Sequence, residues 1–300
     1  MKKTTTNTVP QLKDYKSNTY MEGDMEIRFA IGPEETKQLD TQKLAENFLV
    51  KELMTADKLK LVYSHYDRVI IGGTKPVNKS VSLPNHPELR ADYFLERREL
   101  GIINVGGTGT VTADGKKYKV DQLSCLYLGK GTQHVSFASA SKKNPALFYL
   151  LSAPAHATYP TTLFTKEQAS PVDLGTAETA NKRTVYKYIH LDGIRSCQLV
   201  MGLTVMAPGS VWNSIPPHTH TRRMEVYFYF GLPEEHRIMH FMGNPKETRH
   251  MVMANNEAVI SAPWSTHYGC GTTNYGFIWG MAGENLVYTD MDPAPVASLM

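Results

Sequence analysis

The chain has 300 residues, of which 41% are hydrophobic and 20% charged, a composition that is ordinary for a globular protein and excludes a disordered, collagen-like or coiled-coil chain. Its formal net charge is only +3, so nothing in the charge balance points to a nucleic acid or a membrane surface as partner. The three cysteines, Cys125, Cys197 and Cys270, are scattered and form no C-x-x-C pair, which predicts reduced thiols in a cytoplasmic protein.

The chain begins with a polar segment, residues 1–24, that shows no hydrophobic periodicity. We expect a flexible N-terminal tail there. The segment lacks the apolar stretch of a signal peptide, and no later run approaches the ~18 apolar residues of a membrane span. Helical patterns are few: residues 39–54 predict one helix, and residues 166–170 predict a short turn.

Most of the remaining chain predicts short strands. Runs rich in valine, isoleucine, tyrosine and phenylalanine recur between glycines and prolines. The Asp114-Gly115 step predicts a two-residue hairpin. Short strands at regular spacing predict an all-β fold of the sandwich or barrel type. We expect strands within residues 60–73, 101–120, 122–131, 197–209, 224–231 and 274–281.

A weak internal repeat predicts two copies of one barrel. Each copy has an Arg-Arg pair close to a glutamate, at residues 97–98 and 222–223, and a single histidine further on, His134 or His267. Residues 170–184 are small and polar and form the predicted joint. We therefore expect an N-terminal barrel without metal over residues 25–170 and a C-terminal, metal-binding barrel over residues 171–300.

The predicted metal site lies in the second half, which holds seven of the eleven histidines. His218 and His220 alternate along an extended segment, so both imidazoles can point to one side. Glu225 follows five residues later, and a turn at residues 221–222 would start a new strand and return its carboxylate to that side. Together with His267 they offer three nitrogens and one oxygen, which suit a divalent first-row metal.

The other histidines have less support as ligands. An H-x-H pair alone is common among solvated histidines, and His134 lacks even that companion. We expect His134 to be a hydrogen-bonded structural residue. His236, His240 and His250 are scattered, and we expect them at the surface or behind the ligands.

The strand predicted around residues 223–230 has two different faces. One face is polar and should point into the barrel, and the other is fully apolar and must be covered by the first barrel or by another subunit. Arg223 lies on the polar face and could bind a substrate carboxylate through two hydrogen bonds, or pair with a structural acid instead. The polar face holds Arg223, Glu225, Tyr227 and Tyr229, and the apolar face holds Met224, Val226, Phe228 and Phe230.

The run PHTHTRRMEVYFYF at residues 217–230 resembles the 5-keto-4-deoxyuronate isomerase family of the cupin superfamily. Further similar stretches, among them 62–73, 93–107 and 247–271, extend the resemblance from about residue 36 to the end. Ser265-Thr266 departs from the common cupin pattern, in which a glycine precedes the last histidine. The resemblance implies two tandem cupin barrels with few short helices. It also implies one Zn²⁺ per subunit, held by His218, His220, Glu225 and His267.

The resemblance further implies an aldose–ketose isomerase. Its substrate would be a uronate-derived keto sugar acid, 5-dehydro-4-deoxy-D-glucuronate, and its product 3-deoxy-D-glycero-2,5-hexodiulosonate, in pectin and uronate breakdown. A divalent cation would stabilise the enediolate as charge develops on the substrate oxygens. Zn²⁺ is expected, with another divalent first-row metal as the alternative. The implied protein is a cytoplasmic homo-oligomer, a hexamer.

The catalytic residues expected from the sequence are Glu225, Arg223 and Tyr227. The general base stays open among Tyr227, Glu99, Lys187 and His250. Two other functions are compatible with the same ligands: an iron-dependent cupin dioxygenase, and a sugar-binding protein of two cupin barrels without catalysis.

Overall fold

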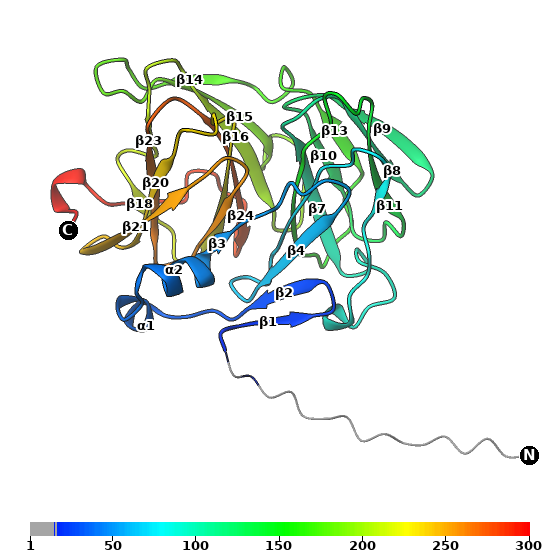
Figure 1. Cartoon of the computed structure of the whole chain (residues 1–300), viewed down its shortest axis with the longest axis horizontal. Coiled ribbons are helices and arrows are strands. Elements are labelled where there is room, and N and C mark those ends of the chain that lie inside the picture. The colour runs from blue at the N-terminus through cyan, green and yellow to red at the C-terminus, as the bar shows by residue number, and fades with distance from the viewer. Residues whose placement is uncertain (1–14, 16) are drawn as a thin grey trace, which may run out of the picture.

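Two β-barrels lie side by side in the computed structural model, which describes residue 15 and residues 17–300 (Figure 1). Each barrel combines one large sheet with a four-stranded sheet. Within the described residues the helices are short: α1 (Pro33–Lys37), α2 (Thr41–Phe48) and two 3-10 turns, Pro87–Leu89 and Val296–Ser298. The prediction of an all-β, two-barrel protein is confirmed.

The first barrel contains an eight-stranded and a four-stranded sheet. In spatial order the larger sheet is β1 (Thr19–Glu22), β2 (Met25–Arg28), β4 (Leu59–Ser64), β5 (Ile70–Thr74), β12 (Phe148–Pro154), β7 (Arg98–Asn104), β10 (Cys125–Leu128) and β13 (Thr162–Phe164). The smaller sheet is β6 (Val81–Ser82), β11 (Val135–Ser139), β8 (Gly109–Ala113) and β9 (Lys116–Val120).

The second barrel contains a seven-stranded and a four-stranded sheet. The larger is β14 (Val172–Leu174), β15 (Arg183–Ile189), β16 (Val200–Met206), β24 (Gly276–Gly283), β19 (Arg223–Phe230), β22 (Ala258–Ser261) and β3 (Leu49–Val50). The smaller is β17 (Trp212–Asn213), β23 (Thr266–Gly271), β20 (Ile238–Asn244) and β21 (Glu247–Met253). A separate two-stranded ladder joins β18 (His218–Thr219) to β25 (Asp292–Pro293).

The two barrels repeat one strand order. The run β4-β5-β12-β7-β10 of the first barrel corresponds to β15-β16-β24-β19-β22 of the second, so β7 and β19 occupy equivalent positions. The small sheets correspond in the same way, with β11 equivalent to β23. The internal repeat inferred from the sequence is therefore present in the fold, as two barrels with the same strand order.

The local predictions are mostly confirmed. The hairpin pairs Ala113 with Lys116, and both turn residues, Asp114 and Gly115, have positive φ, as a two-residue turn of this kind requires. The predicted helix over 39–54 is too long. It spans only α2, which Asp40 begins by accepting a hydrogen bond from the Lys43 amide.

Helix α2 ends because the next residues join a sheet. Leu49 and Val50 form β3 and pair with β22 of the second barrel, where both side chains are buried. Helices α1 and α2 likewise pack against strands of the second barrel. A segment near the start of the chain thus contributes to the barrel that otherwise follows residue 170.

Of the predicted tail, residues 1–14 and 16 lie outside the described residues. Thr19–Glu22 form β1, which pairs with β2 across a turn at Gly23, whose φ of +60° suits glycine. At the other predicted boundary, β13 is the last strand of the first barrel and β14 the first strand after it to join the second. Among the described residues no helix is long and apolar enough to cross a membrane.

Candidate metal centre

Three strands and one turn bring four side chains together. His218 lies on β18, and the chain turns back after His220, where the Arg223 amide donates to the His220 carbonyl at 3.0 Å. The predicted turn at residues 221–222 is therefore present, and β19 starts directly after it. Glu225 projects from β19 and His267 from β23 of the opposite sheet.

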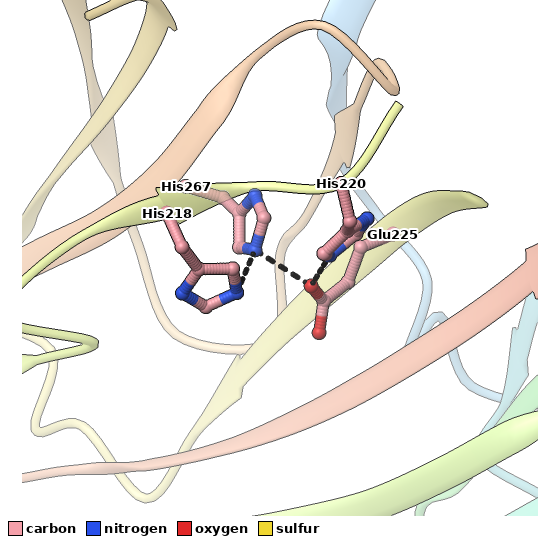
Figure 2. Close-up of side chains that lie close together, drawn as sticks. All are labelled: His218, His220, Glu225 and His267. Carbon is pink, nitrogen blue, oxygen red and sulfur yellow. Dashed lines mark hydrogen bonds and ion pairs between the residues drawn. The ribbon is translucent and has the colours of Figure 1, made fainter. Parts of the chain in front are cut away.

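The four side chains converge on one point (Figure 2). One ligand atom from each residue lies within 4.8 Å of all the others. The His267 Nε2 lies 2.7 Å from Glu225 Oε2 and 3.0 Å from His218 Nε2, and His220 Nε2 lies 3.0 Å from the same carboxylate oxygen. Three of the residues are buried, and His218 is partly exposed.

The second nitrogen of two imidazoles is held by the backbone. His220 Nδ1 lies 2.9 Å from the Arg223 carbonyl oxygen, and His267 Nδ1 lies 3.3 Å from the Ser265 carbonyl oxygen. A carbonyl can only accept, so each Nδ1 must carry the proton. In the neutral form of each ring the lone pair is then on Nε2 and is directed at the centre, which is the arrangement typical of metal-bound histidines.

Ser265 and Thr266, where the sequence departs from the common cupin pattern, also have a structural role. The Ser265 hydroxyl accepts a hydrogen bond from the Gly243 amide at 2.8 Å, and the Thr266 hydroxyl donates to the Gly243 carbonyl. Both side chains are completely buried. They fasten the start of β23 to β20 and so fix the backbone that carries His267.

The electrostatics of the cluster favour an anionic carboxylate. Burial alone would raise the pKa of Glu225, but His267 and His220 together hold it below its ordinary value. Burial and the neighbouring His267 lower the pKa of His218 to about 3. Burial also works to lower the pKa of His220, but Glu225 raises it above the ordinary value. The cluster thus contains one negatively charged carboxylate, that of Glu225, surrounded by imidazoles.

A cavity of about 330 Å³ opens beside the cluster, and His218 and Glu225 form part of its wall. Most of the remaining wall is apolar or aromatic, from Val185, Phe277, Trp279, Met281, Tyr288 and Met291 among others. Polar groups enter it at few points, among them Tyr227, Ser214 and Arg183. A mostly apolar pocket with a few convergent polar groups is the usual form of a small-molecule site.

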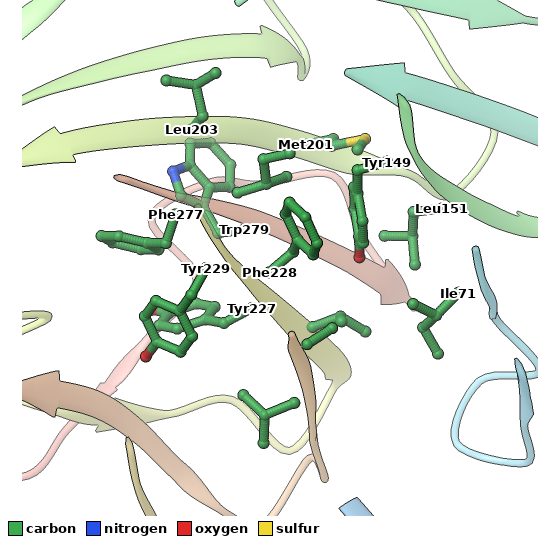
Figure 3. Packing of buried hydrophobic residues seen from close by; sticks show 14 of the residues in the cluster. Ile71, Tyr149, Leu151, Met201, Leu203, Tyr227, Phe228, Tyr229, Phe277 and Trp279 are labelled. Carbon is green, nitrogen blue, oxygen red and sulfur yellow. The ribbon is translucent and has the colours of Figure 1, made fainter. Parts of the chain in front are cut away.

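The opposite face of β19 is buried against the first barrel (Figure 3). Met224, Val226 and Phe228 are fully buried, and Phe230 is 7% exposed. The rings of Phe228 and Tyr149, which belongs to β12 of the first barrel, stack at 4.8 Å. The predicted division of β19 into two faces is confirmed, and the first barrel provides the cover.

The three predicted catalytic residues occupy different surroundings. Glu225 is in the cluster, and Tyr227 lines the cavity with its hydroxyl 2.7 Å from that of Ser214. Burial and the nearby Glu225 raise the pKa of Tyr227 well above its ordinary value. Arg223 is completely buried, does not line the cavity, and donates from Nη2 to the Asp290 carbonyl at 2.9 Å.

The other candidates for the base lie apart from the cluster. Glu99 is buried between the barrels, His250 is exposed on β21, and Lys187 lies over the ring of Tyr288 at 5.4 Å. His134 is exposed in the first barrel, and its backbone rather than its ring makes the described hydrogen bonds: its amide donates to the Asp114 carboxylate at 2.8 Å, and its carbonyl accepts from the Asp114 amide at 2.9 Å.

Among the scattered histidines, one lies just behind the cluster. His240 is fully buried, and its Nδ1 lies 2.8 Å from the hydroxyl of Tyr229. Burial lowers the pKa of His240 to about 3.

Sequence reasoning missed Arg183, Ser214 and Tyr288 as residues of the cavity. Arg183 stands in the segment that we predicted as the joint, and the run RTVYKYI of β15, rich in valine, isoleucine and tyrosine, was the signal that could have found it.

Comparisons with known proteins find relatives over most of the chain. The model of the KduI/IolB family matches residues 48–296. The 4-deoxy-L-threo-5-hexosulose-uronate ketol-isomerase of Shouchella clausii is 52% identical over 275 residues, 92% of this chain and 100% of that protein.

Two solved structures share the fold at low identity. An IolB-like protein from Salmonella typhimurium is 16% identical, with a TM-score of 0.61 over 73% of this chain and 85% of that one. Oxalate decarboxylase from Bacillus subtilis, described with Mn(II) centres, is 9% identical, with a TM-score of 0.51 over 75% and 71% of the two chains. The cupin-like fold expected from the sequence is thereby confirmed.

Proposed function

This chain belongs to the KduI/IolB family, and we propose that its cavity is the active site in which 5-dehydro-4-deoxy-D-glucuronate is isomerised to 3-deoxy-D-glycero-2,5-hexodiulosonate. The enzyme is a ketol-isomerase, like the relatives that share about half of its residues. The observation that carries the assignment of the site is the convergence of four ligand atoms within 4.8 Å at the wall of the cavity.

The residues fit a zinc ion. Three imidazole nitrogens and one carboxylate oxygen are ligands that Zn²⁺ accepts, and the carbonyls behind His220 and His267 hold the tautomer that binding needs. When bound, a divalent cation would stabilise negative charge developing on the substrate's carbonyl and hydroxyl oxygens. His218, His220, Glu225 and His267 would hold it, and another first-row divalent metal could take the same place.

The reaction needs only an internal transfer of hydrogen. A proton leaves C2 of the substrate, the C1 aldehyde becomes an enediol carbon, and a proton returns to C1 while the C2 hydroxyl becomes a ketone. Tyr227 keeps its phenolic proton at neutral pH, since its pKa is raised further above an ordinary value that already lies near 10. Its hydroxyl can therefore donate a hydrogen bond to an oxygen of the enediolate, supported by Ser214.

Arg223 supports the cluster from behind in this proposal. Its carbonyl oxygen orients His220, and its guanidinium holds the Asp290 carbonyl in the loop that also carries Tyr288 and Met291 of the cavity wall. These contacts give Arg223 a positioning role, through both a ligand and the wall of the cavity.

The experiment that tests this function combines turnover with metal content. Purified protein is incubated with the unsaturated-uronate product mixture, and the signals of the aldehyde proton at C1 and of the new CH₂OH group are followed by NMR. We expect loss of the first and growth of the second, with no uptake of oxygen. Oxygen consumption would instead favour an iron dioxygenase, and binding without turnover would favour a non-catalytic sugar-binding protein.

We extend the proposal to the setting of the enzyme. A homo-hexamer in the cytoplasm, acting in pectin and uronate breakdown, follows from the resemblance of residues 217–230 to the isomerase family. Light scattering of the purified protein tests the assembly directly.

A further inference from the structure

The cavity carries a positive charge that neither the cluster nor the proposed chemistry uses. Arg183 begins β15, and its side chain lines the cavity together with His218 and Glu225. It is the one lysine or arginine among the described residues that line this cavity. The guanidinium therefore faces the same space as the cluster, from another strand of the same sheet.

Arg183 lacks an acidic partner within the described part of the chain. Its Nη1 donates to the Asn181 carbonyl at 2.8 Å, and the ionisable groups close enough to act on it are the hydroxyls of Tyr288, Tyr227 and Tyr275. Burial lowers its pKa from the ordinary value. A guanidinium has five N–H donors, so most of its capacity remains available to a ligand.

The two neighbouring arginines of the site differ in this respect. Arg222 is already paired with Asp290 and Asp292, at 2.7 and 2.8 Å. Arg223 is sealed from the cavity and stands beside the charge of Glu225. Of the three, Arg183 alone combines contact with the cavity and freedom from a carboxylate in the described structure.

The spacing suits an elongated ligand with a charged end. Arg183 and Glu225 stand three strands apart in the sheet order β15-β16-β24-β19. They are also offset along the strands, because Arg183 pairs with Met206 of β16 whereas Glu225 is level, through Met281, with Val200. Both residues nevertheless line one cavity, so Arg183 and the cluster lie towards different ends of the space that an elongated ligand would fill. Between the two polar ends the wall consists of Val185, Phe277 and Trp279.

We propose that Arg183 binds the carboxylate of the substrate and thereby places the opposite, reacting end of a six-carbon keto acid at the metal cluster. The inference rests on the proposed function of the same cavity. It assigns recognition of the acid group to β15 and leaves Arg223 its positioning role. Guanidinium and carboxylate match in a two-hydrogen-bond geometry that an ammonium cannot reproduce.

The kinetic test compares Arg183→Gln and Arg183→Lys with Lys182→Gln, which removes a charge from the exposed residue next to it. For Arg183→Gln we expect KM to rise at least about tenfold, as for a lost charge-assisted hydrogen bond, while kcat and metal content change far less. Arg183→Lys should lie between Gln and wild type. Lys182→Gln should behave like wild type.

A binding test separates this inference from the proposed reaction. L-Gulonate and D-glucitol differ only in a carboxylate against an alcohol, and neither has an aldehyde to isomerise. By calorimetry, zinc-loaded wild type should bind gulonate at least about tenfold more tightly than glucitol, and Arg183→Gln should bind both equally.

The outcomes are distinct. If wild type is inactive but its preference for gulonate depends on Arg183, the proposed reaction is wrong and the carboxylate site stands. An active wild type whose Arg183→Gln variant retains its KM and its preference for gulonate overturns the inference alone. If wild type neither isomerises the keto acid nor prefers gulonate, both fail.

Discussion

The two barrels share a strand order but differ in what they enclose. In β7 of the first barrel the residues that point inward after Arg98 are Leu100 and Ile102, which belong to an apolar core. In β19 of the second barrel the inward positions after Arg223 are Glu225 and Tyr227, a member of the metal cluster and a residue of the cavity. The same architecture thus forms a packed core in one copy and the proposed reaction site in the other.

The glutamates near the two Arg-Arg pairs show how this difference arises. Glu99 directly follows its arginine, whereas Glu225 is one residue further from its own. Because side chains alternate along a strand, one residue moves a side chain to the other face. Glu99 therefore points at the second barrel, where its carboxylate accepts hydrogen bonds from the amides of residues 197–199 at 2.7 to 2.9 Å.

The comparison also explains how the second barrel tolerates a polar interior. Its sheet β16-β24-β19 packs on the first barrel, so its apolar outer face forms a core that the two barrels share. The first barrel keeps a separate apolar cluster of its own. We infer that the first barrel is a structural support for the second.

The largest effect is expected from a charge in the shared core. Phe228→Asp places a carboxylate at a fully buried position that stacks on Tyr149. The loss of a buried phenylalanine costs roughly 3–5 kcal/mol, and burial of an unpaired charge adds several more, so we expect failure to fold or to assemble. Val252→Asp, at a site 55% exposed on β21, is the control. Melting curves and size measurements decide, and an unchanged Phe228→Asp protein would refute the shared core.

A smaller loss of stability is expected at the contact between the barrels. Glu99→Gln replaces one acceptor oxygen by an NH₂ group that faces amides and the Tyr127 hydroxyl, itself 2.7 Å from the carboxylate. Each buried polar group left unsatisfied costs about 1–3 kcal/mol, so we expect roughly 3 kcal/mol in urea unfolding.

Metal content of the folded Glu99→Gln protein should equal that of wild type, since this carboxylate is not in the cluster. Glu234→Gln, on an exposed turn, serves as the control for the chemical change. A Glu99→Gln protein as stable as wild type would show that the interbarrel hydrogen bonds contribute nothing measurable.

The equivalent change in the second barrel should act on chemistry instead. Glu225→Gln keeps the shape of the side chain but removes the anionic donor that His220 and His267 surround. We expect weaker metal binding and a fall in kcat/KM of well over tenfold, where each ~1.4 kcal/mol of lost transition-state stabilisation is a factor of ten. Steady-state kinetics with parallel metal analysis tests this, and normal metal with normal turnover would exclude Glu225 as a ligand.

The smallest effect is expected at the histidine that the repeat places in the first barrel. His134 is exposed beside β11, the strand equivalent to β23. His134→Ala should leave metal content, activity and melting unchanged, whereas His267→Ala should lose metal. A loss of metal in His134→Ala would mean that the first barrel also participates in the site.

Much of this organisation follows from the sequence, because alternation and turns are local. The faces of β19, the turn after His220 and the Asp114-Gly115 hairpin each depend on a few adjacent residues. The end of α2 was missed because Leu49 pairs with β22, some 200 residues away in the chain. Such pairings are tertiary and override a helical pattern.

The site shows the same limit. The spacing of His218, His220 and Glu225 pointed to the cluster because a strand and a turn connect them. Arg183 enters the cavity only because β15 is three strands from β19, an order that no local pattern contains. The position of Glu99, between barrels, likewise depends on packing that the repeated Arg-Arg pair could not reveal.

A single catalytic metal in the second barrel is the feature that would separate the two barrels most clearly. The most direct measurement removes metal with a chelator and then adds Zn²⁺ stepwise while isomerisation is followed. We expect negligible activity without metal and a maximum at one equivalent per chain. Full activity in the metal-free protein, or a maximum at two equivalents, would contradict it.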